Sequence, residues 1–156
     1  MKSSVSIIRS TFAVLASAGL LAACGGESRA DVEIVGMQTG VSRQQYLAMP
    51  DSARLEQEKD AASTGETRGV AVEVLLKIDG YKGSTLPLAY TLHDARNELP
   101  FISRKAAIKP DAPQWSKRGQ VWLPVLSAGT YYVQVVLGDT TGRKTDGPKT
   151  EDFTVQ

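Results

Sequence analysis

The chain has 156 residues, with 18 Lys and Arg against 17 Asp and Glu, and it carries one cysteine and one histidine. This length suits a single domain of ordinary size. The near-neutral charge excludes a strongly basic nucleic-acid-binding protein. The single cysteine and histidine exclude an intramolecular disulfide and a zinc site built from several Cys and His. We therefore expect no metal ion and no other cofactor.

Residues 1–23 have the organisation of a secretory signal peptide. Lys2 and Arg9 come before an apolar run that ends at Leu21, and no acidic residue occurs before Glu27. The run is too short to span a bilayer, which takes about 20 residues. It has the length of the hydrophobic region of a secretory signal.

The run ends in Leu21-Ala22-Ala23-Cys24-Gly25, which resembles the lipobox of bacterial lipoproteins. The resemblance implies that Cys24 takes a diacylglycerol group as a thioether and that a signal peptidase cuts between Ala23 and Cys24. The freed amine is then open to acylation, for example with palmitate. The alternative is an ordinary signal peptide followed by a chance cysteine.

One acyl chain anchors a protein only weakly, whereas two or three chains give a stable membrane attachment. Because Gly25 and not Asp follows Cys24, the resemblance favours the outer membrane in a host that has two membranes. Residues 24–30 are then a lipidated tether whose last six residues reach about 20 Å when extended. We expect the folded part to lie close to the bilayer.

Residues 31–68 are expected to form an N-terminal strand, a polar helical segment and a linker. Asp31–Val35 alternates in part and is the expected first strand. Ser42 and Gln45 have the spacing of a helix capping box, and Pro50 interrupts the pattern that follows.

Residues 51–59 predict a polar helix with few apolar anchors, in which Glu56 and Lys59 are spaced to pair. Residues 63–67 are rich in small and polar types, which is typical of a flexible linker. We expect this region to be a surface helix or partly disordered, and not a second domain.

From Gly69 onward the apolar pattern has a period of two residues, which indicates strands with one buried face. Pro100 predicts that Leu99–Ile102 is a short edge strand. Because no amphipathic helices separate the strands, we expect an antiparallel sandwich of about seven strands over residues 69–156. The residues expected to face the core are Val70, Val72, Val74, Leu76, Ile78, Leu86, Leu88, Tyr90, Leu92, Val121, Leu123, Val125, Tyr131, Val133, Val135, Leu137, Phe153 and Val155.

The segment Ser127-Ala128-Gly129-Thr130-Tyr131 resembles the approach to the tyrosine corner of immunoglobulin-like domains. In that corner a tyrosine at the start of a late strand donates a hydrogen bond to the preceding loop, and Tyr131 is the candidate. The resemblance covers Gly69–Gln156 and implies a mainly β, antiparallel, immunoglobulin-like sandwich. The missing cysteine pair departs from antibody domains and agrees with fibronectin-like ones.

The titratable residues give little sign of catalysis. His93 and Asp94 are neighbours on a strand, so their side chains point to opposite faces. Asp79, Asp94, Asp111 and Asp139 lie at strand ends or in turns, where aspartate commonly bonds to the backbone. The sequence has no calcium-loop motif and no glycine-rich phosphate loop.

Trp115, Lys117, Arg118 and Trp122 form a tentative binding surface. Trp122 is out of phase with the apolar residues around it and is expected to face outward. An exposed tryptophan beside basic residues suits contact with a sugar, a peptide or a lipid interface. The alternative is that the tryptophans cover the edge of the core while the basic residues form a solvated face.

The sequence therefore predicts a lipoprotein of the cell envelope, anchored in the membrane through Cys24, with a non-catalytic binding or assembly role. An envelope protein or a glycan is the expected partner. One alternative is a small envelope hydrolase that uses His93 or strand-end carboxylates. Another is an accessory or structural subunit that pairs with a partner through an exposed edge strand.

Overall fold

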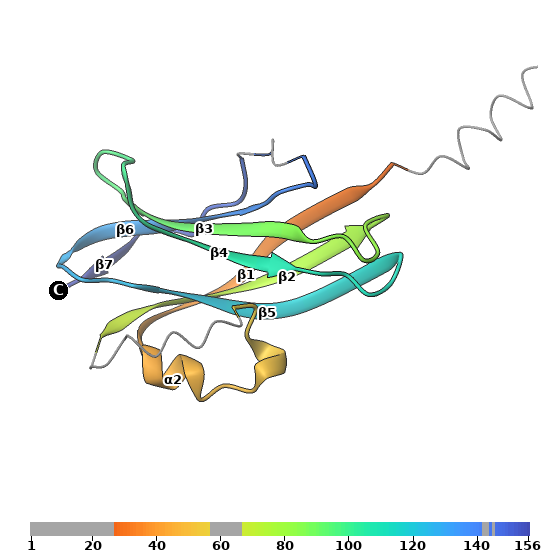
Figure 1. The fold of residues 1–156 in the computed structure, drawn as a ribbon. Coiled ribbons are helices and arrows are strands. Elements are labelled where there is room, and N and C mark those ends of the chain that lie inside the picture. The colour runs from red at the N-terminus through yellow and green to blue at the C-terminus, as the bar shows by residue number, and fades with distance from the viewer. Residues whose placement is uncertain (1–26, 57–66, 142–143, 145) are drawn as a thin grey trace, which may run out of the picture.

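The computed structural model describes residues 27–56, 67–141, 144 and 146–156, which form a sandwich of two antiparallel sheets (Figure 1). One sheet has three strands in the order β1-β2-β5, and the other has four in the order β4-β3-β6-β7. The strands are β1 Arg29–Ser42, β2 Arg68–Asp79, β3 Leu86–Asp94, β4 Pro100–Ile108, β5 Gln114–Pro124, β6 Gly129–Leu137 and β7 Phe153–Val155. The prediction of a mainly β chain with about seven antiparallel strands is confirmed.

The main core lies between the two sheets and follows the predicted alternation. The five inward residues of β2, from Val70 to Ile78, and the four of β3, from Leu86 to Leu92, are each at most 3% exposed. Full burial of one such side chain contributes about 1.5–3 kcal/mol. Apolar packing therefore holds the sheets together without a disulfide.

The first strand is longer than predicted and belongs to the sandwich. It runs over Arg29–Ser42 instead of Asp31–Val35, and it pairs with β2 along its whole length, with register shifts at two places. The domain boundary expected between residues 68 and 69 falls inside β2. The edge strand expected at Leu99–Ile102 extends through Ile108 as β4.

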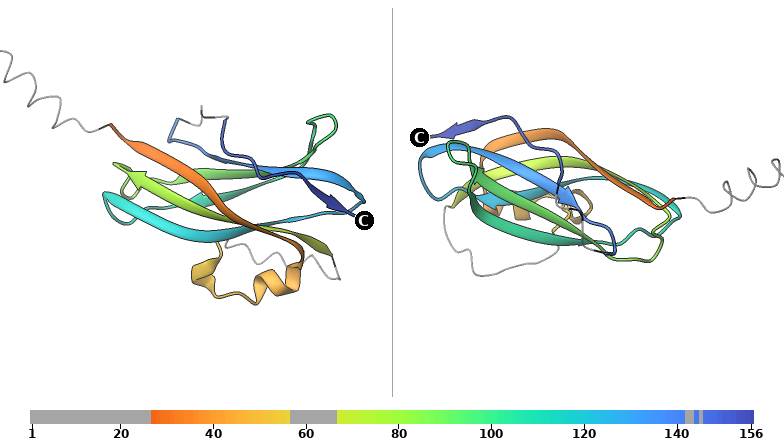
Figure 2. Two further views of the ribbon diagram at one scale, coloured as in Figure 1. Left: turned by 180° about the vertical axis from the view of Figure 1, so that it is seen from behind. Right: turned by 90° about the horizontal axis from the view of Figure 1, so that it is seen from above.

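The predicted capping box is present at the start of helix α2, Arg43–Leu47. The Ser42 hydroxyl accepts a hydrogen bond from the Gln45 amide at 3.1 Å, and the Ser42 amide donates to Gln45 Oε1 at 2.8 Å. Two of the four free amides at a helix start are satisfied in this way. The short helix lies against the outer face of the three-stranded sheet (Figure 2).

The polar helix predicted for residues 51–59 is wrong where the structure describes it. A 3-10 turn, η1, covers Asp51–Ala53, and Arg54 is then extended and forms a parallel bridge with Gln120 of β5. The Leu55 amide donates to the Gln120 carbonyl at 3.0 Å, and the Leu55 side chain is buried in the main core. Burial of Leu55 and pairing with a sheet edge outweigh a weak helix propensity. Residues 57–66, which include Lys59 and most of the predicted linker, lie outside the described residues.

The sandwich has two ends, named here the Arg29 end and the Leu126 end. Strand β1 begins at the Arg29 end, where the Gly80 amide donates to the Pro113 carbonyl at 2.9 Å. The turns of residues 95–99 and 125–128 lie at the Leu126 end, where the Ala95 amide donates to the Thr130 carbonyl at 2.9 Å. Figures 1 and 2 show these ends at opposite extremes of the long axis.

Candidate binding surfaces

The four residues of the tentative binding surface do not lie together. Trp115 and Lys117 are on the core-facing side of β5, in phase with Val121, and Arg118 and Trp122 are on its outer side. Successive side chains of a strand point to opposite faces. Of the four, only Arg118 is exposed, and it pairs with Glu73 at 3.5 Å, while Trp115 and Lys117 are partly buried.

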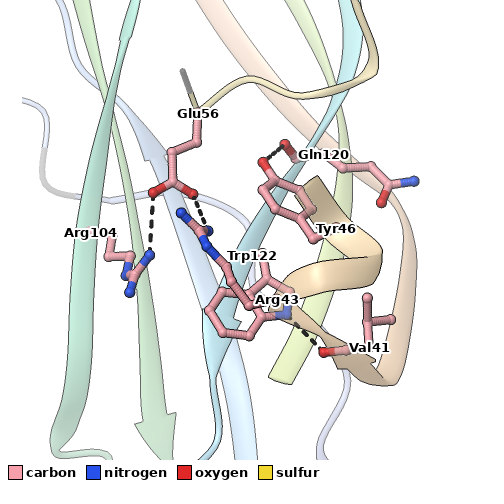
Figure 3. A network of polar contacts seen from close by, with 7 residues as sticks. All are labelled: Val41, Arg43, Tyr46, Glu56, Arg104, Gln120 and Trp122. Carbon is pink, nitrogen blue, oxygen red and sulfur yellow. Dashed lines mark hydrogen bonds and ion pairs between the residues drawn. The ribbon is translucent and has the colours of Figure 1, made fainter. Parts of the chain in front are cut away.

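Trp122 faces outward from its sheet, as its phase predicts, but it is not exposed. Only 1% of its surface is accessible, because α2 and the end of β1 cover it. The indole N–H donates to the Val41 carbonyl at 2.9 Å, and the Tyr46 hydroxyl donates to the Gln120 carbonyl at 2.8 Å (Figure 3). With Ala71 these side chains form a second core, so the prediction of Trp122 as a binding residue is wrong.

A buried ion cluster joins this second core to the edge of the sandwich (Figure 3). One carboxylate oxygen of Glu56 accepts from Arg43 at 3.1 Å, and the other accepts from Arg104 at 3.2 Å. Arg43 is 2% exposed and Glu56 is 7% exposed. The two guanidinium carbons lie 5.1 and 5.6 Å from the centre of the Trp122 ring, within cation–π range.

The sequence contains one signal for this cluster, the phase of Arg104 in its strand. Arg104 occupies an inward position of β4, in phase with the apolar residues Ile102, Ala106 and Ile108. A charge at an inward position of a strand requires a partner of opposite sign. Glu56 supplies that partner. Lys59, with which the sequence predicts a helical pair, lies outside the described residues.

Two tyrosines beside Glu56 have altered acidity. Burial, and then the charge of Glu56, raises the pKa of Tyr46 to about 12. The same two causes raise the pKa of Tyr90 well above its usual range. Both hydroxyls therefore stay protonated at neutral pH, and Tyr46 acts as a hydrogen-bond donor.

His93 and Asp94 are engaged in separate contacts. The His93 ring stacks on Tyr132 with 4.9 Å between ring centres, and its Nδ1 lies 3.2 Å from the Glu98 carbonyl oxygen. Asp94 accepts from the Arg96 amide at 2.8 Å. This is the turn role expected of such aspartates.

The same role is seen for Asp139, which accepts from the Thr141 amide at 2.9 Å. Gly142 of the same predicted turn lies outside the described residues. Within the described ranges, no three His, Cys, Asp or Glu side chains gather as a metal site would require.

The outer face of the three-stranded sheet is left open near the Arg29 end and forms a groove of about 680 Å³. Two ion pairs lie in it: Arg29 to Asp31 at 2.6 Å and Lys77 to Glu33 at 3.9 Å. Leu75 also lines the groove. The Trp115 side chain lies on the core-facing side of β5 and packs against the main core, so the structure does not support it as an exposed binding residue.

The Leu126 end carries three exposed large apolar side chains. Leu99, Phe101 and Leu126 are 61%, 50% and 67% exposed. The Phe101 ring lies against Tyr131, with 6.0 Å between ring centres, and the Tyr131 hydroxyl donates to the Ser127 carbonyl at 3.0 Å. The hydrogen bond predicted for Tyr131 is therefore present, and it fixes the loop that presents Leu126.

Ala23 and Cys24, the predicted cleavage and lipidation site, lie outside the described residues. None of the helices in the described part of the chain is long and apolar enough to cross a bilayer. A comparison with protein families finds none whose profile matches the chain, and a comparison with curated proteins finds no match.

Proposed function

We propose that the chain is a lipoprotein of the cell envelope, anchored through Cys24, whose sandwich docks an envelope protein at the Leu126 end. The observation that carries this proposal is the position of the exposed apolar side chains. Leu99, Phe101 and Leu126 belong to the turns and the start of β4 at the Leu126 end, whereas β1 begins with Arg29 at the opposite end.

The geometry favours a partner away from the anchoring membrane. Four residues separate Cys24 from Arg29, so the Arg29 end stays near the lipid. Strand β1 has 14 residues, which at about 3.3 Å per residue span roughly 45 Å. The Leu126 end therefore projects into the space beyond the membrane surface.

The chemistry of the Leu126 end favours a protein over a glycan. Exposed large apolar side chains gathered at one place are typical of protein–protein contact sites. Two of the aromatic rings at this end are buried: Tyr131 packs against Phe101, and Phe153 packs against Tyr131. The partner would present apolar side chains to Leu99, Phe101 and Leu126.

The arrangement of the strands supports an immunoglobulin-like sandwich of the fibronectin-like variety. The first, second and fifth strands share one sheet, and the fourth, third, sixth and seventh share the other. The bond from Tyr131 to Ser127 has the form of a tyrosine corner. Loops at the ends of such sandwiches are common binding sites, which agrees with docking at the Leu126 end.

Pairing with a partner through an edge strand has less support, because each described edge strand has a feature that hinders pairing with another strand. Strand β1 has two irregularities of register, and β7 has only three residues. Strand β4 has Pro100 and the inward Arg104, and Arg54 pairs with part of β5. These are devices by which proteins prevent edge pairing. The hydrolase alternative has less support too, because the described residues show no nucleophile paired with a general base.

Anchoring is tested by labelling cells with a fatty-acid probe. The chain should take up label, and Cys24→Ala should lose the label and leave the membrane fraction. Ser28→Ala, in the same tether, is the matched control and should keep both. Label that persists in Cys24→Ala would show that the lipid site is elsewhere or absent.

Docking is tested with a photoreactive amino acid placed at Leu126 or, as control, at Lys77 in the groove. Native envelopes should give one defined protein adduct from position 126 and no protein adduct from position 77. Phe101→Ser should abolish the adduct while the circular dichroism of the protein stays unchanged. Equal adducts from both positions, or none from position 126, would contradict docking at this end.

A further inference from the structure

The groove at the Arg29 end places charges of alternating sign on one face of two paired strands. Arg29 of β1 lies directly opposite Asp79 of β2, and Asp31 lies directly opposite Lys77. Residues two apart on a strand share a face, so the four side chains form a two-by-two checkerboard in which each cation has a carboxylate on two sides. All four line the groove.

We propose that this groove binds the headgroup of phosphatidylethanolamine, with Arg29 and Lys77 on its phosphate and Asp31 and Asp79 on its ammonium group. The proposal rests on the anchoring proposed above, because the lipid must be within reach. Four residues between Cys24 and Arg29 extend to about 14 Å at most. The groove therefore opens close to the headgroup layer of the anchoring membrane.

The charges of the groove are free to exchange partners. The side chains of Arg29 and Lys77 are 77% and 61% exposed. Ion pairs between such exposed side chains are weak, because water and salt screen them and their long chains are mobile. A zwitterion can replace both internal pairs at once, since it brings one charge of each sign.

The balance of charge selects a zwitterionic headgroup over an anionic one. The lining has three carboxylates, Asp31, Glu33 and Asp79, against the two cations Arg29 and Lys77. This excess of negative charge would repel the headgroup of an anionic lipid. The primary ammonium of phosphoethanolamine donates hydrogen bonds to carboxylates, whereas the quaternary ammonium of phosphocholine cannot and is bound instead by aromatic cages.

The backbone amide NMR signals of Arg29, Asp31, Leu75 and Lys77 offer a direct readout, because these residues line the groove. The lipidated chain in detergent is titrated with glycerophosphoethanolamine, glycerophosphocholine, glycerophosphoglycerol and inorganic phosphate. Only glycerophosphoethanolamine should shift these signals. Lys77→Gln and Asp31→Asn should each weaken its binding about tenfold, which is the usual effect of losing one charged hydrogen bond. Arg96→Gln, a cation at the Leu126 end, is the control and should bind as the unaltered chain does.

A second experiment, in membranes, distinguishes binding of a lipid headgroup from binding of a free solute. In nanodiscs, the amides of residues 29–33 and 75–79 should exchange with deuterium more slowly when phosphatidylethanolamine is present than in phosphatidylcholine alone. The proposal is overturned if no probe shifts the amide signals, if phosphate acts as well as glycerophosphoethanolamine, or if the two lipids give equal exchange. A chain that takes up the fatty-acid label but fails these tests leaves the anchoring proposal standing, while a chain without label overturns the anchoring.

Discussion

The side chain of Leu55 lies directly over Gly119, so close that a methyl group at position 119 would come within 2.7 Å of Leu55 Cγ and Cδ2. This contact fixes the extended segment Arg54–Glu56 against the edge of β5. Gly119→Ala should therefore push Leu55 out of the core and lower the free energy of unfolding by about 1–3 kcal/mol. Urea unfolding of the purified chain measures the change.

Gly36→Ala is the matched control for this substitution. A methyl group at position 36 would come within 3.2 Å of the Glu73 carboxylate, which is the movable end of a partly exposed side chain. The loss there should be clearly smaller. In the double variant Gly119→Ala with Leu55→Ala the two effects should not add, because they share one contact, and full additivity would contradict the packing described.

Glu56→Gln should destabilise the protein through the loss of the charge between Arg43 and Arg104. Breaking a buried ion pair from one side leaves an uncompensated charge and typically costs about 3–5 kcal/mol. Glu33→Gln removes a carboxylate whose pair with Lys77 is 3.9 Å long and exposed, and its cost should stay below about 1 kcal/mol. Equal losses in the two variants, measured by urea unfolding, would show that the cluster adds little.

Trp122 should be shielded from solvent quenchers although it faces outward from its sheet. In Trp115→Phe only Trp122 emits, and its fluorescence should be blue-shifted and weakly quenched by acrylamide. In the unaltered chain, the partly exposed Trp115 should add a component that acrylamide quenches readily. Strong quenching in Trp115→Phe would place Trp122 at the surface, against the cover provided by α2.

Alkaline pH should destabilise the fold through Tyr46. Its pKa is raised from 10.0 to about 12 in the folded chain, first by burial and then by Glu56. Between these values the unfolded chain loses the phenolic proton while the folded chain keeps it. The unfolded state then binds fewer protons, so stability falls as pH rises from about 10 to about 12 and is fully retained below that range.

Tyr46→Phe removes this titration. At about pH 8 the variant should be less stable by about 1 kcal/mol, because it loses the hydrogen bond to the Gln120 carbonyl. Its stability should then fall less steeply toward about pH 11 than that of the unaltered chain. Tyr131→Phe is a useful comparison, since its hydroxyl also donates to a backbone carbonyl. Parallel pH profiles for the unaltered chain and Tyr46→Phe would contradict the role of Tyr46.

Local patterns in the sequence were enough to predict most of the β structure. The alternation from Val70 to Ile78 and from Leu86 to Leu92 names the buried face of each strand, because the period of two is a property of the extended backbone itself. The spacing of Ser42 and Gln45 predicted a helix start for a similar reason, since both partners of a capping box lie within one turn. The bond of Tyr131 also spans only four residues.

The candidate sites depended on contacts that no local pattern encodes. The phase of Trp122 shows which side of β5 it occupies, but only the path of residues 43–56 decides that this side is covered. Leu55 and Glu56 do not form the predicted helix, because each contacts a residue far away in the sequence. Leu55 packs over Gly119, and Glu56 accepts a hydrogen bond from Arg104.

By itself the sequence determined the period of the strands, the helix start, the hydrogen bond of Tyr131 and the expectation of a lipid at Cys24. Each of these rests on residues that are neighbours along the chain. The tertiary structure alone decided that Trp122 is buried, that Glu56 joins two arginines and that Arg29, Asp31, Lys77 and Asp79 meet in one groove. Those outcomes depend on strand register and on which segment covers which face, and both are set by the packing of residues far apart in the sequence.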